Sequence, residues 1–257
     1  MIRWIFFDVG NVILNDDPAM AFFYHEIYQA IRENGSCITL DEVLAAREHS
    51  ILVERNGRHY DTVGKKFLDH MTWQNLDKRI RRTLADNWAD LSPLMPGIVP
   101  VIQILAKQFN LGIIANQPRE VKRILEDHGL LGYFQVHGIS QIVGMSKPDP
   151  FFFEWALDQS RCAPREALMI GDRIDNDVRP AKSIGLKTLW LKLPLSKKGY
   201  QPQTEFEQRY FQSLEKASAS HLPPQDESET PDGIAEDFES ILLQIERLTS
   251  WETILDS

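Results

Sequence analysis

The amino-acid sequence predicts an α/β fold, a doubly wound parallel sheet with an all-helical subdomain inserted after the first strand. Short apolar runs alternate with helical segments through most of the chain, which is typical of parallel strands joined by crossover helices. A long stretch in which apolar residues recur only at helical spacing separates the first apolar run from the second. Several of the runs end in a polar residue, as expected where strands deliver side chains to a binding edge.

The first predicted strand is the apolar run Trp4–Phe7, which ends at Asp8. Consecutive apolar residues are typical of a strand that is buried on both faces of a parallel sheet. Ligands of open α/β sheets bind at the carboxyl ends of the strands, so Asp8 lies where a functional carboxylate is expected. The alternative is that Asp8 only caps the turn that follows. Gly10 and Asn11 then form a turn that lets backbone groups approach a ligand.

Residues 16–92 are predicted to form the inserted helical subdomain. Apolar residues from Met20 to Ile31 recur at helical spacing, and Thr39 with Glu42 forms a capping box before the next helix. Two further helical patterns span roughly Asp61–Met71 and Asn75–Asp90. The subdomain is therefore expected to consist of helices alone.

From residue 93 the pattern alternates between helix and strand. Four further short segments predict strands, at Leu111–Ala115, Gln135–Gly138, Ala167–Ile170 and Leu186–Leu191. The segments between them predict helices at Ile98–Phe109, Arg119–His128 and Phe152–Gln159, and one that ends at Ile184. Together with residues 1–15, residues 93–257 are predicted to form the α/β domain.

The end of this domain departs from the alternating pattern. Residues 195–233 include a helix capped by Thr204 and Glu207, followed by a low-complexity stretch rich in Ser, Pro, Asp and Glu, so residues 217–233 are expected to be mobile. Residues 234–249 have an apolar stripe at helical spacing, which predicts a closing helix packed on the sheet.

Composition limits the classes of function. The 257 residues have a formal net charge of −9, which argues against nucleic acid or acidic membranes as partners, since both need clustered positive charge. Cys37 and Cys162 have no metal-ligand spacing, and their scarcity fits a reducing cytoplasm. No run has the length of a signal-peptide core or a membrane span. We therefore expect a soluble, cytoplasmic protein; the sequence gives no indication of its oligomeric state.

Polar residues at the strand ends suggest the chemistry. Asp8, Asp172 and Asp177 are hard oxygen ligands of the kind that hold Mg²⁺ together with a substrate phosphate. A divalent cation would neutralise a phosphoryl group while a carboxylate attacks it, and Lys147 would offset the remaining negative charge. Asn116, at the end of the second strand, faces the same edge of the predicted sheet.

These motifs resemble the haloacid dehalogenase-like hydrolase superfamily, over residues 2 to about 193. In that family the first strand ends in an aspartate nucleophile, which is Asp8 here. The second strand ends in Ser or Thr followed by Asn, which here are Ala115 and Asn116. A lysine before proline is the third motif, at Lys147.

The fourth motif of the family is an acidic metal-binding loop, here Asp172 to Asp177. The family also uses the backbone carbonyl at the position of Gly10 as a metal ligand. The resemblance implies a Rossmann-like core and a helical cap, residues 16–92, which closes over the site and selects the substrate.

The implied function is a Mg²⁺-dependent phosphatase that acts on a small phosphorylated metabolite. Asp8 would form the aspartyl-phosphate, Lys147 would stabilise charge, and the metal ligands would be Asp8, Gly10, Asp172 and Asp177. Asn11, Ala115 and Asn116 would contact the substrate phosphate.

Two positions depart from the family pattern and leave alternatives open. Gly10 stands where phosphatases usually carry a second aspartate as general acid and base, and Ala115 stands where a hydroxyl binds the phosphoryl group. One alternative is a catalytically weakened or inactive member with a binding or regulatory role. Another is a 2-haloacid dehalogenase, which needs no metal. A phosphonate hydrolase, with Lys65 or Lys66 as the Schiff-base lysine, is the third.

Overall fold

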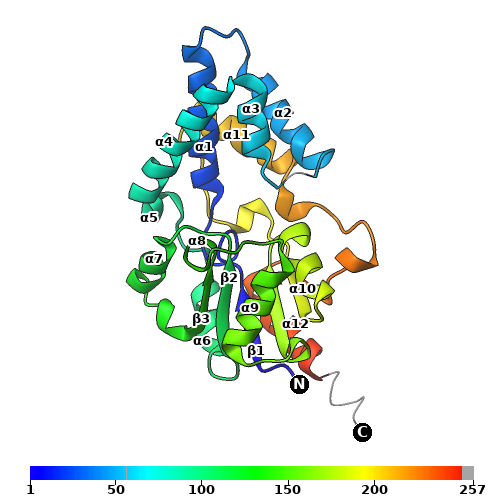
Figure 1. The fold of residues 1–257 in the computed structure, drawn as a ribbon. Helices are drawn as coiled ribbons and strands as arrows, with labels where there is room; N and C mark the ends of the chain where they lie inside the picture. Colours follow the sequence, from blue (N-terminus) through cyan, green and yellow to red (C-terminus); the bar gives the residue numbers. More distant parts are fainter. Residues whose placement is uncertain (56, 251–257) are drawn as a thin grey trace. The chain divides into compact units, whose positions relative to one another are not determined.

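The computed structural model describes residues 1–55 and 57–250, and the chain divides into two compact units (Figure 1). The α/β unit comprises Met1–Asn15, Leu94–Gly199 and Pro223–Ser257, of which residues 251–257 lie outside the described part. The helical unit comprises Asp16–Pro93 and Tyr200–Leu222. Each unit is therefore assembled from separate segments of the chain.

In the described part of the α/β unit, six strands form one sheet in the order β3-β2-β1-β4-β5-β6, and all neighbouring pairs are parallel. This confirms the predicted fold class. The short sixth strand was not predicted, because it lies next to the low-complexity stretch. The strands are β1 Trp4–Phe7, β2 Asn110–Ala115, β3 Phe134–Ile139, β4 Ala167–Gly171, β5 Lys187–Leu191 and β6 Gly233–Ala235.

The register of the central strands brings the predicted polar residues to one edge. Phe7 at the end of β1 pairs with Ile113 of β2 and Ile170 of β4. The backbone N–H of Asp8 continues this ladder and donates to the carbonyl of Ile170 at 2.9 Å. Asp8 is therefore level with Gly171, and Asp172 follows one residue later on the adjacent strand.

Helices cover both faces of the sheet (Figure 1). On one face, Trp4 and Phe6 of β1 stack on each other at 5.7 Å and share a buried cluster with Phe152 of α9 and Ala181 of α10. Alternate strand residues point to the opposite face, where α12 packs against α6, β5 and β6. The helices of this unit are α6 Ile98–Leu105, α7 Val121–Asp127, α8 Ser140–Val143, α9 Pro150–Ser160, α10 Arg179–Ser183 and α12 Phe238–Ser250.

The first segment of the helical unit forms the expected helices. Phe23, Ile27 and Ile31 are buried, as the predicted apolar stripe requires. The capping box also forms, with the N–H of Glu42 donating to Thr39 Oγ1 and the N–H of Thr39 donating to the Glu42 carboxylate. The helices are α1 Asp17–Glu33, α2 Leu40–Leu52, α3 His59–Phe67, α4 His70–Asp86 and α5 Trp88–Leu91.

Helix α11, Glu205–Lys216, also packs in the helical unit, against α1 and α2. This differs from the prediction from sequence, in which residues 93–257 all belong to the α/β domain. The anchor is Arg47 of α2, which is 1% exposed and donates to both the carbonyl and the hydroxyl of Ser213 at 3.0 Å. Its guanidinium also lies 5.1 Å from the ring centre of Tyr210. This contact joins residues far apart in the chain, so local sequence patterns could not reveal it.

The stretch expected to be mobile is packed instead. Ala217 and Leu222 form a buried cluster with Ile51 of α2 in the helical unit. In the α/β unit, Glu229 is 3% exposed and pairs with Arg179 at 3.3 Å. A few anchoring residues thus order a segment whose average composition resembles a flexible linker.

The remaining composition-based expectations concern cysteines and membranes. Cys37 is exposed and Cys162 is buried, and both are free thiols. Burial raises the pKa of the Cys162 thiol to about 11, so this thiol is protonated near neutral pH. Across residues 1–55 and 57–250, no helix combines the length and apolar character needed to cross a bilayer.

Candidate active site

Three carboxylates gather at the carboxyl edge of the sheet. Among the described residues, Asp8, Asp172 and Asp177 each place one ligand atom within 4.8 Å of the others. Asp8 follows β1, Asp172 follows β4, and Asp177 belongs to the helical turn Ile174–Val178. All three side chains are buried, so the sequence-predicted acidic residues form one compact cluster.

Lys147 lies inside this cluster. Its Nζ is 2.8 Å from Asp8 Oδ1 and 2.6 Å from Asp177 Oδ1, and its side chain is fully buried. Asn116 holds the lysine's backbone: Asn116 Nδ2 donates to the Lys147 carbonyl, and the Lys147 N–H donates to Asn116 Oδ1, both at 2.8 Å. The amide of Asn116, predicted to bind phosphate, therefore positions the Lys147 loop in this structure.

Asp177 can approach the end of β4 because residue 171 is glycine. A Cβ at Gly171 would lie 2.3 Å from Asp177 Cβ, which is far inside van der Waals contact. The backbone N–H of Arg173 donates to Asp177 Oδ2 at 3.0 Å, and Lys147 donates to Oδ1. Both carboxylate oxygens of Asp177 are thus engaged by protein groups.

The electrostatics of the cluster favour an added cation. Burial raises the pKa of Asp8, with Lys147 opposing this change and the charge of Asp172 adding to it. Burial likewise raises the pKa of Asp177. For Lys147, burial acts to lower the pKa, but the adjacent Asp177 and Asp8 raise it overall. Arg173 also lies near Asp172 and Asp177, but it pairs with Asp175. The three buried carboxylates therefore leave excess negative charge, and their oxygens fit the ligand preference of Mg²⁺.

The loop after Asp8 is closed by backbone hydrogen bonds. The N–H groups of Ile13 and Leu14 donate to the Val9 carbonyl at 2.8 and 2.9 Å. Asn11 adopts φ 54°, a left-handed conformation that asparagine tolerates better than most residues. Gly10, the predicted carbonyl ligand, is buried within this loop.

Ala115 lies at the end of β2 and is fully buried. Its methyl group offers neither a donor nor an acceptor, whereas a serine or threonine at this position would offer a hydroxyl. The predicted phosphate contact at residue 115 is therefore limited to its backbone.

Several residues that support the site were missed by sequence reasoning. Trp190 Nε1 donates to the Asp172 carbonyl at 2.8 Å, and Arg173 supplies the N–H that holds Asp177. Lys198 Nζ donates to Asn11 Oδ1 at 3.1 Å, and Asn15 Nδ2 donates to the Lys198 carbonyl at 2.8 Å. The contacts of Lys198 join residues more than 180 positions apart, and no local motif marks them.

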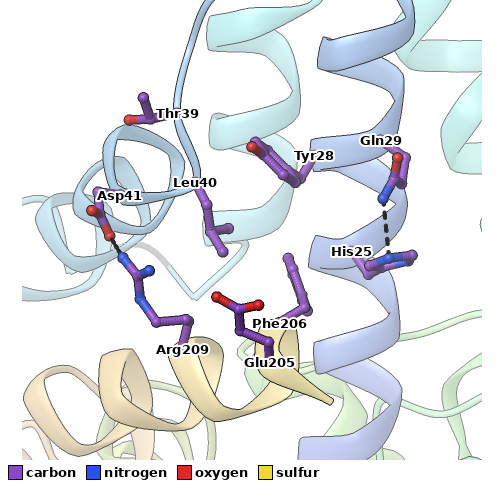
Figure 2. Close-up of a pocket in the computed structure, with 9 residues that line it drawn as sticks. All are labelled: His25, Tyr28, Gln29, Thr39, Leu40, Asp41, Glu205, Phe206 and Arg209. Carbon is purple, nitrogen blue, oxygen red and sulfur yellow. Dashed lines mark hydrogen bonds and ion pairs between the residues drawn. The ribbon is translucent and has the colours of Figure 1, made fainter.

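The helical unit has a cavity of its own, of about 410 Å³. Figure 2 shows side chains from α1, the start of α2 and the start of α11 around it, with Arg209 paired to Asp41 and Gln29 bonded to His25. Acidic, basic and aromatic groups all line it, so its chemistry does not single out one ligand class. None of the predicted site residues is among its lining residues, which are His25, Tyr28, Gln29, Thr39, Leu40, Asp41, Glu205, Phe206 and Arg209.

Comparison with known families identifies a family for most of the chain. The model of the haloacid dehalogenase-like hydrolases matches residues 2–185, which is more than half of the chain. The matched range contains Asp8, Lys147 and the acidic loop, and it ends before Lys198.

Related proteins include several phosphatases. A phosphoglycolate phosphatase from Aliivibrio fischeri is 26% identical over 194 residues, covering 72% of this chain and 81% of the relative. A glyceraldehyde 3-phosphate phosphatase from Methanocaldococcus jannaschii is 24% identical over 196 residues, covering 74% and 84%. A pyrimidine 5'-nucleotidase from Escherichia coli is 30% identical over 115 residues, covering 44% of this chain. The chain spans only 51% of that relative's length.

Solved structures show the same fold with different activities in their names. A predicted phosphoglycolate phosphatase from Haemophilus somnus has a TM-score of 0.65 at 19% identity, covering 94% of this chain and 96% of that one. A 2-haloacid dehalogenase from Pseudomonas syringae has a TM-score of 0.57 at 20% identity, covering 96% and 99%. At these identities the likeness establishes the fold, and the reaction must be argued from the site.

Proposed function

The chain belongs to the haloacid dehalogenase-like hydrolases, and on that premise we propose that it is a Mg²⁺-dependent phosphatase that acts on small phosphorylated metabolites. The observation that carries the proposal is the buried cluster of Asp8, Asp172 and Asp177 with Lys147 inside it. The phosphatase names of the relatives support a small phosphorylated substrate.

In the proposed reaction a carboxylate oxygen of Asp8 attacks phosphorus, and the bond to the leaving oxygen breaks. The leaving group departs as an alcohol once it has gained a proton. Water then attacks the aspartyl-phosphate, releases inorganic phosphate and restores the Asp8 carboxylate. Lys147, 2.8 Å from Asp8, stabilises negative charge on the phosphoryl oxygens during both steps.

The metal site in this proposal consists of Asp8, Asp172 and the Gly10 carbonyl. Bound Mg²⁺ would neutralise charge on the phosphoryl group. Asp177 supports the metal site without binding the metal directly, because its two oxygens already accept hydrogen bonds from Lys147 and Arg173. Its main contribution is to orient Lys147 toward Asp8.

The site favours phosphoester hydrolysis over the other reactions considered for this superfamily. Dehalogenation by an aspartate needs no metal and gives no reason for three buried carboxylates at one point. Phosphonate cleavage needs a reactive lysine, whereas Lys65 is half exposed and pairs with Asp61 at 2.6 Å on the surface of α3. A weakened, binding-only member would keep the metal site but lack turnover. A measurement of phosphoester turnover therefore distinguishes the phosphatase from the binding-only protein.

Turnover of a phosphoester panel with and without Mg²⁺ tests the proposal. We expect Asp8→Asn to reduce turnover by about 10³-fold or more, because it removes the nucleophile. Mg²⁺ binding, measured by calorimetry, should weaken more in Asp172→Asn than in Asp177→Asn, since a supporting residue typically contributes about 10- to 100-fold. Asp158→Asn, an exposed change on α9, is the control.

Three results would contradict the proposal. Equal turnover by wild type and Asp8→Asn would place the nucleophile elsewhere. Turnover that survives complete removal of divalent cations would exclude the metal role of Asp172. A wild-type protein that binds Mg²⁺ but cleaves no phosphoester would identify the weakened, binding-only alternative.

A further inference from the structure

We propose that Lys198 is a positioning residue for the reaction at Asp8. It orients the side-chain amide of Asn11 so that the Nδ2 group donates a hydrogen bond to a phosphoryl oxygen of the substrate. The inference rests on the proposed function and assigns a role to a residue beyond the range that matches the family model.

Lys198 is held at both ends within the α/β unit. It is 3% exposed, although it lies near the boundary where the chain leaves this unit at Gly199. Asn15 Nδ2 donates to its backbone carbonyl at 2.8 Å, and its own Nζ donates to Asn11 Oδ1 at 3.1 Å. Asn15 is itself completely buried. The lysine therefore connects two places in the segment that follows the nucleophile.

The backbone beside Lys198 is also tightly defined. Gly199 has φ 76°, and a Cβ on it would lie 2.8 Å from Pro96 Cγ. Only glycine fits both the left-handed conformation and this close approach. The chain can therefore turn immediately after Lys198 while the lysine side chain stays inside the unit.

Burial of this lysine calls for a reason, because removing an ammonium group from water is costly unless it is hydrogen-bonded. The neighbouring Lys197 shows the ordinary alternative: its side chain is 48% exposed and pairs with Asp237 at 3.0 Å on the surface. Two adjacent lysines thus have opposite environments. The buried one contacts the loop that follows Asp8.

The contact with Asn11 determines which way its amide faces. An ammonium group has donors and no acceptor, so of the two polar atoms of the Asn11 amide it can hydrogen-bond only to the oxygen. The Nδ2 group is then directed away from Lys198 as a donor. The backbone of Asn11 is restrained as well, by its φ of 54° and by the bond from its N–H to the Leu14 carbonyl at 2.6 Å. Through this contact Lys198 holds the Nδ2 donor of Asn11 in a fixed orientation, three residues after the nucleophile Asp8.

Binding of inorganic phosphate in the presence of Mg²⁺ tests this role. We expect Lys198→Met and Asn11→Gly each to weaken phosphate binding about tenfold, the size of one hydrogen bond to a charged group. Glycine removes the Asn11 amide but keeps the left-handed backbone accessible. If both residues act through one contact, the double variant should lose no more than either single variant. Affinity for Mg²⁺ should not change.

Matched variants separate positioning from stability. Lys197→Met changes the adjacent exposed lysine and should leave phosphate binding at the wild-type level. Lys198→Arg keeps a group that only donates, so it should retain more phosphate affinity than Lys198→Gln, whose amide can also accept. Melting temperatures identify variants that lose affinity through unfolding. Asn11→Gly tests the same contact from the other side, because it removes the acceptor of Lys198 Nζ and leaves the lysine itself in place.

Additive losses in the double variant, or wild-type phosphate affinity in a folded Lys198→Met protein, would overturn this inference and leave the proposed function intact. A wild-type protein that neither binds phosphate nor hydrolyses phosphoesters would overturn both. Non-additive losses with unchanged Mg²⁺ affinity would support the positioning role.

Discussion

At the scale of single residues, Gly10 bears on how the leaving group would obtain its proton in the proposed reaction. A carboxylic acid at this position would protonate the departing oxygen, and general acid catalysis is typically worth about 10²- to 10⁴-fold. Glycine offers no such group. In the proposed reaction, substrates whose leaving oxygen is weakly basic lose least from this absence.

We predict that the wild-type protein cleaves aryl and acyl phosphates much faster than alkyl phosphates, and that Gly10→Asp reduces this difference. Rates measured over a series of leaving groups of graded basicity check the prediction. The backbone of Gly10 is compatible with an aspartate, because Gly10 is not one of the glycines with positive φ in the described residues. Melting temperature and Mg²⁺ binding of the variant serve as controls.

A wild-type rate that barely depends on the leaving group would contradict this account of Gly10. Another residue would then act as the acid. Alanine substitution of Asp16 and Asp17, the next acidic residues in the chain, would be the measurement to follow.

The same scale shows how far the sequence predicts a site. Asp8, Lys147 and Asp172 could be identified because each follows a strand or lies in a short motif, and the structure places them together. Lys198 and Asn15 could not be identified. Their roles depend on contacts across more than 180 positions, and a lysine or asparagine in a loop has no local pattern that signals burial.

At the scale of elements, strands were predicted better than helix ends. The apolar run that forms β1 is buried throughout and could be recognised without its neighbours. The closing helix was predicted from residue 234, whereas α12 begins at Phe238 and Ile234 belongs to β6. An apolar stripe does not separate a short strand from the helix that follows it. The capping residue Asp237 marks the true start.

We predict that Asp237→Ala destabilises the protein by about 1 kcal/mol near neutral pH, the usual cost of removing a helix cap. The Ser240 N–H donates to Asp237 Oδ1 at 2.8 Å, and this bond, with help from Lys197, lowers the pKa of Asp237 to about 2. A carboxyl whose folded pKa lies below its ordinary value of 3.8 stabilises the fold above about pH 4. That contribution is lost as the pH falls from about 4 to 2.

Denaturant unfolding of wild type and Asp237→Ala at neutral pH and near pH 3 checks this prediction. The difference between the two proteins should shrink at the lower pH. Asp237→Asn keeps a capping oxygen without the titrating charge, so at neutral pH its stability should lie between those of Asp237→Ala and wild type, and near pH 3 it should approach wild type. A difference that stays constant with pH would show that the Asp237 charge contributes nothing.

At the scale of the whole molecule, the chain crosses four times between its two units. The helical unit is built from Asp16–Pro93 and Tyr200–Leu222, and the second segment lies beyond the range that matches the family model. Predicting this assembly from sequence would require knowing that Arg47 and Ser213 meet. Alternating apolar runs contain no such information, so residues 200–222 were placed with the wrong unit.

If α11 is an integral part of the helical unit, removing its anchor should loosen α1 and α2 as well. Tyr210 is 1% exposed and stacks on Tyr24 of α1 at 5.5 Å, beside the Arg47 guanidinium. We predict that Tyr210→Ala lowers the stability of the helical unit by about 3–5 kcal/mol, the usual cost of truncating a buried aromatic side chain.

Hydrogen exchange followed by mass spectrometry should then show faster exchange in α1, α2 and α11 together. Peptides from β1, β2 and β4 should keep wild-type protection, because these strands belong to the other unit. Tyr210→Phe keeps the ring and should remain close to wild type. Faster exchange confined to residues 200–222 would instead show that α11 is an appendage on a helical unit that is stable without it.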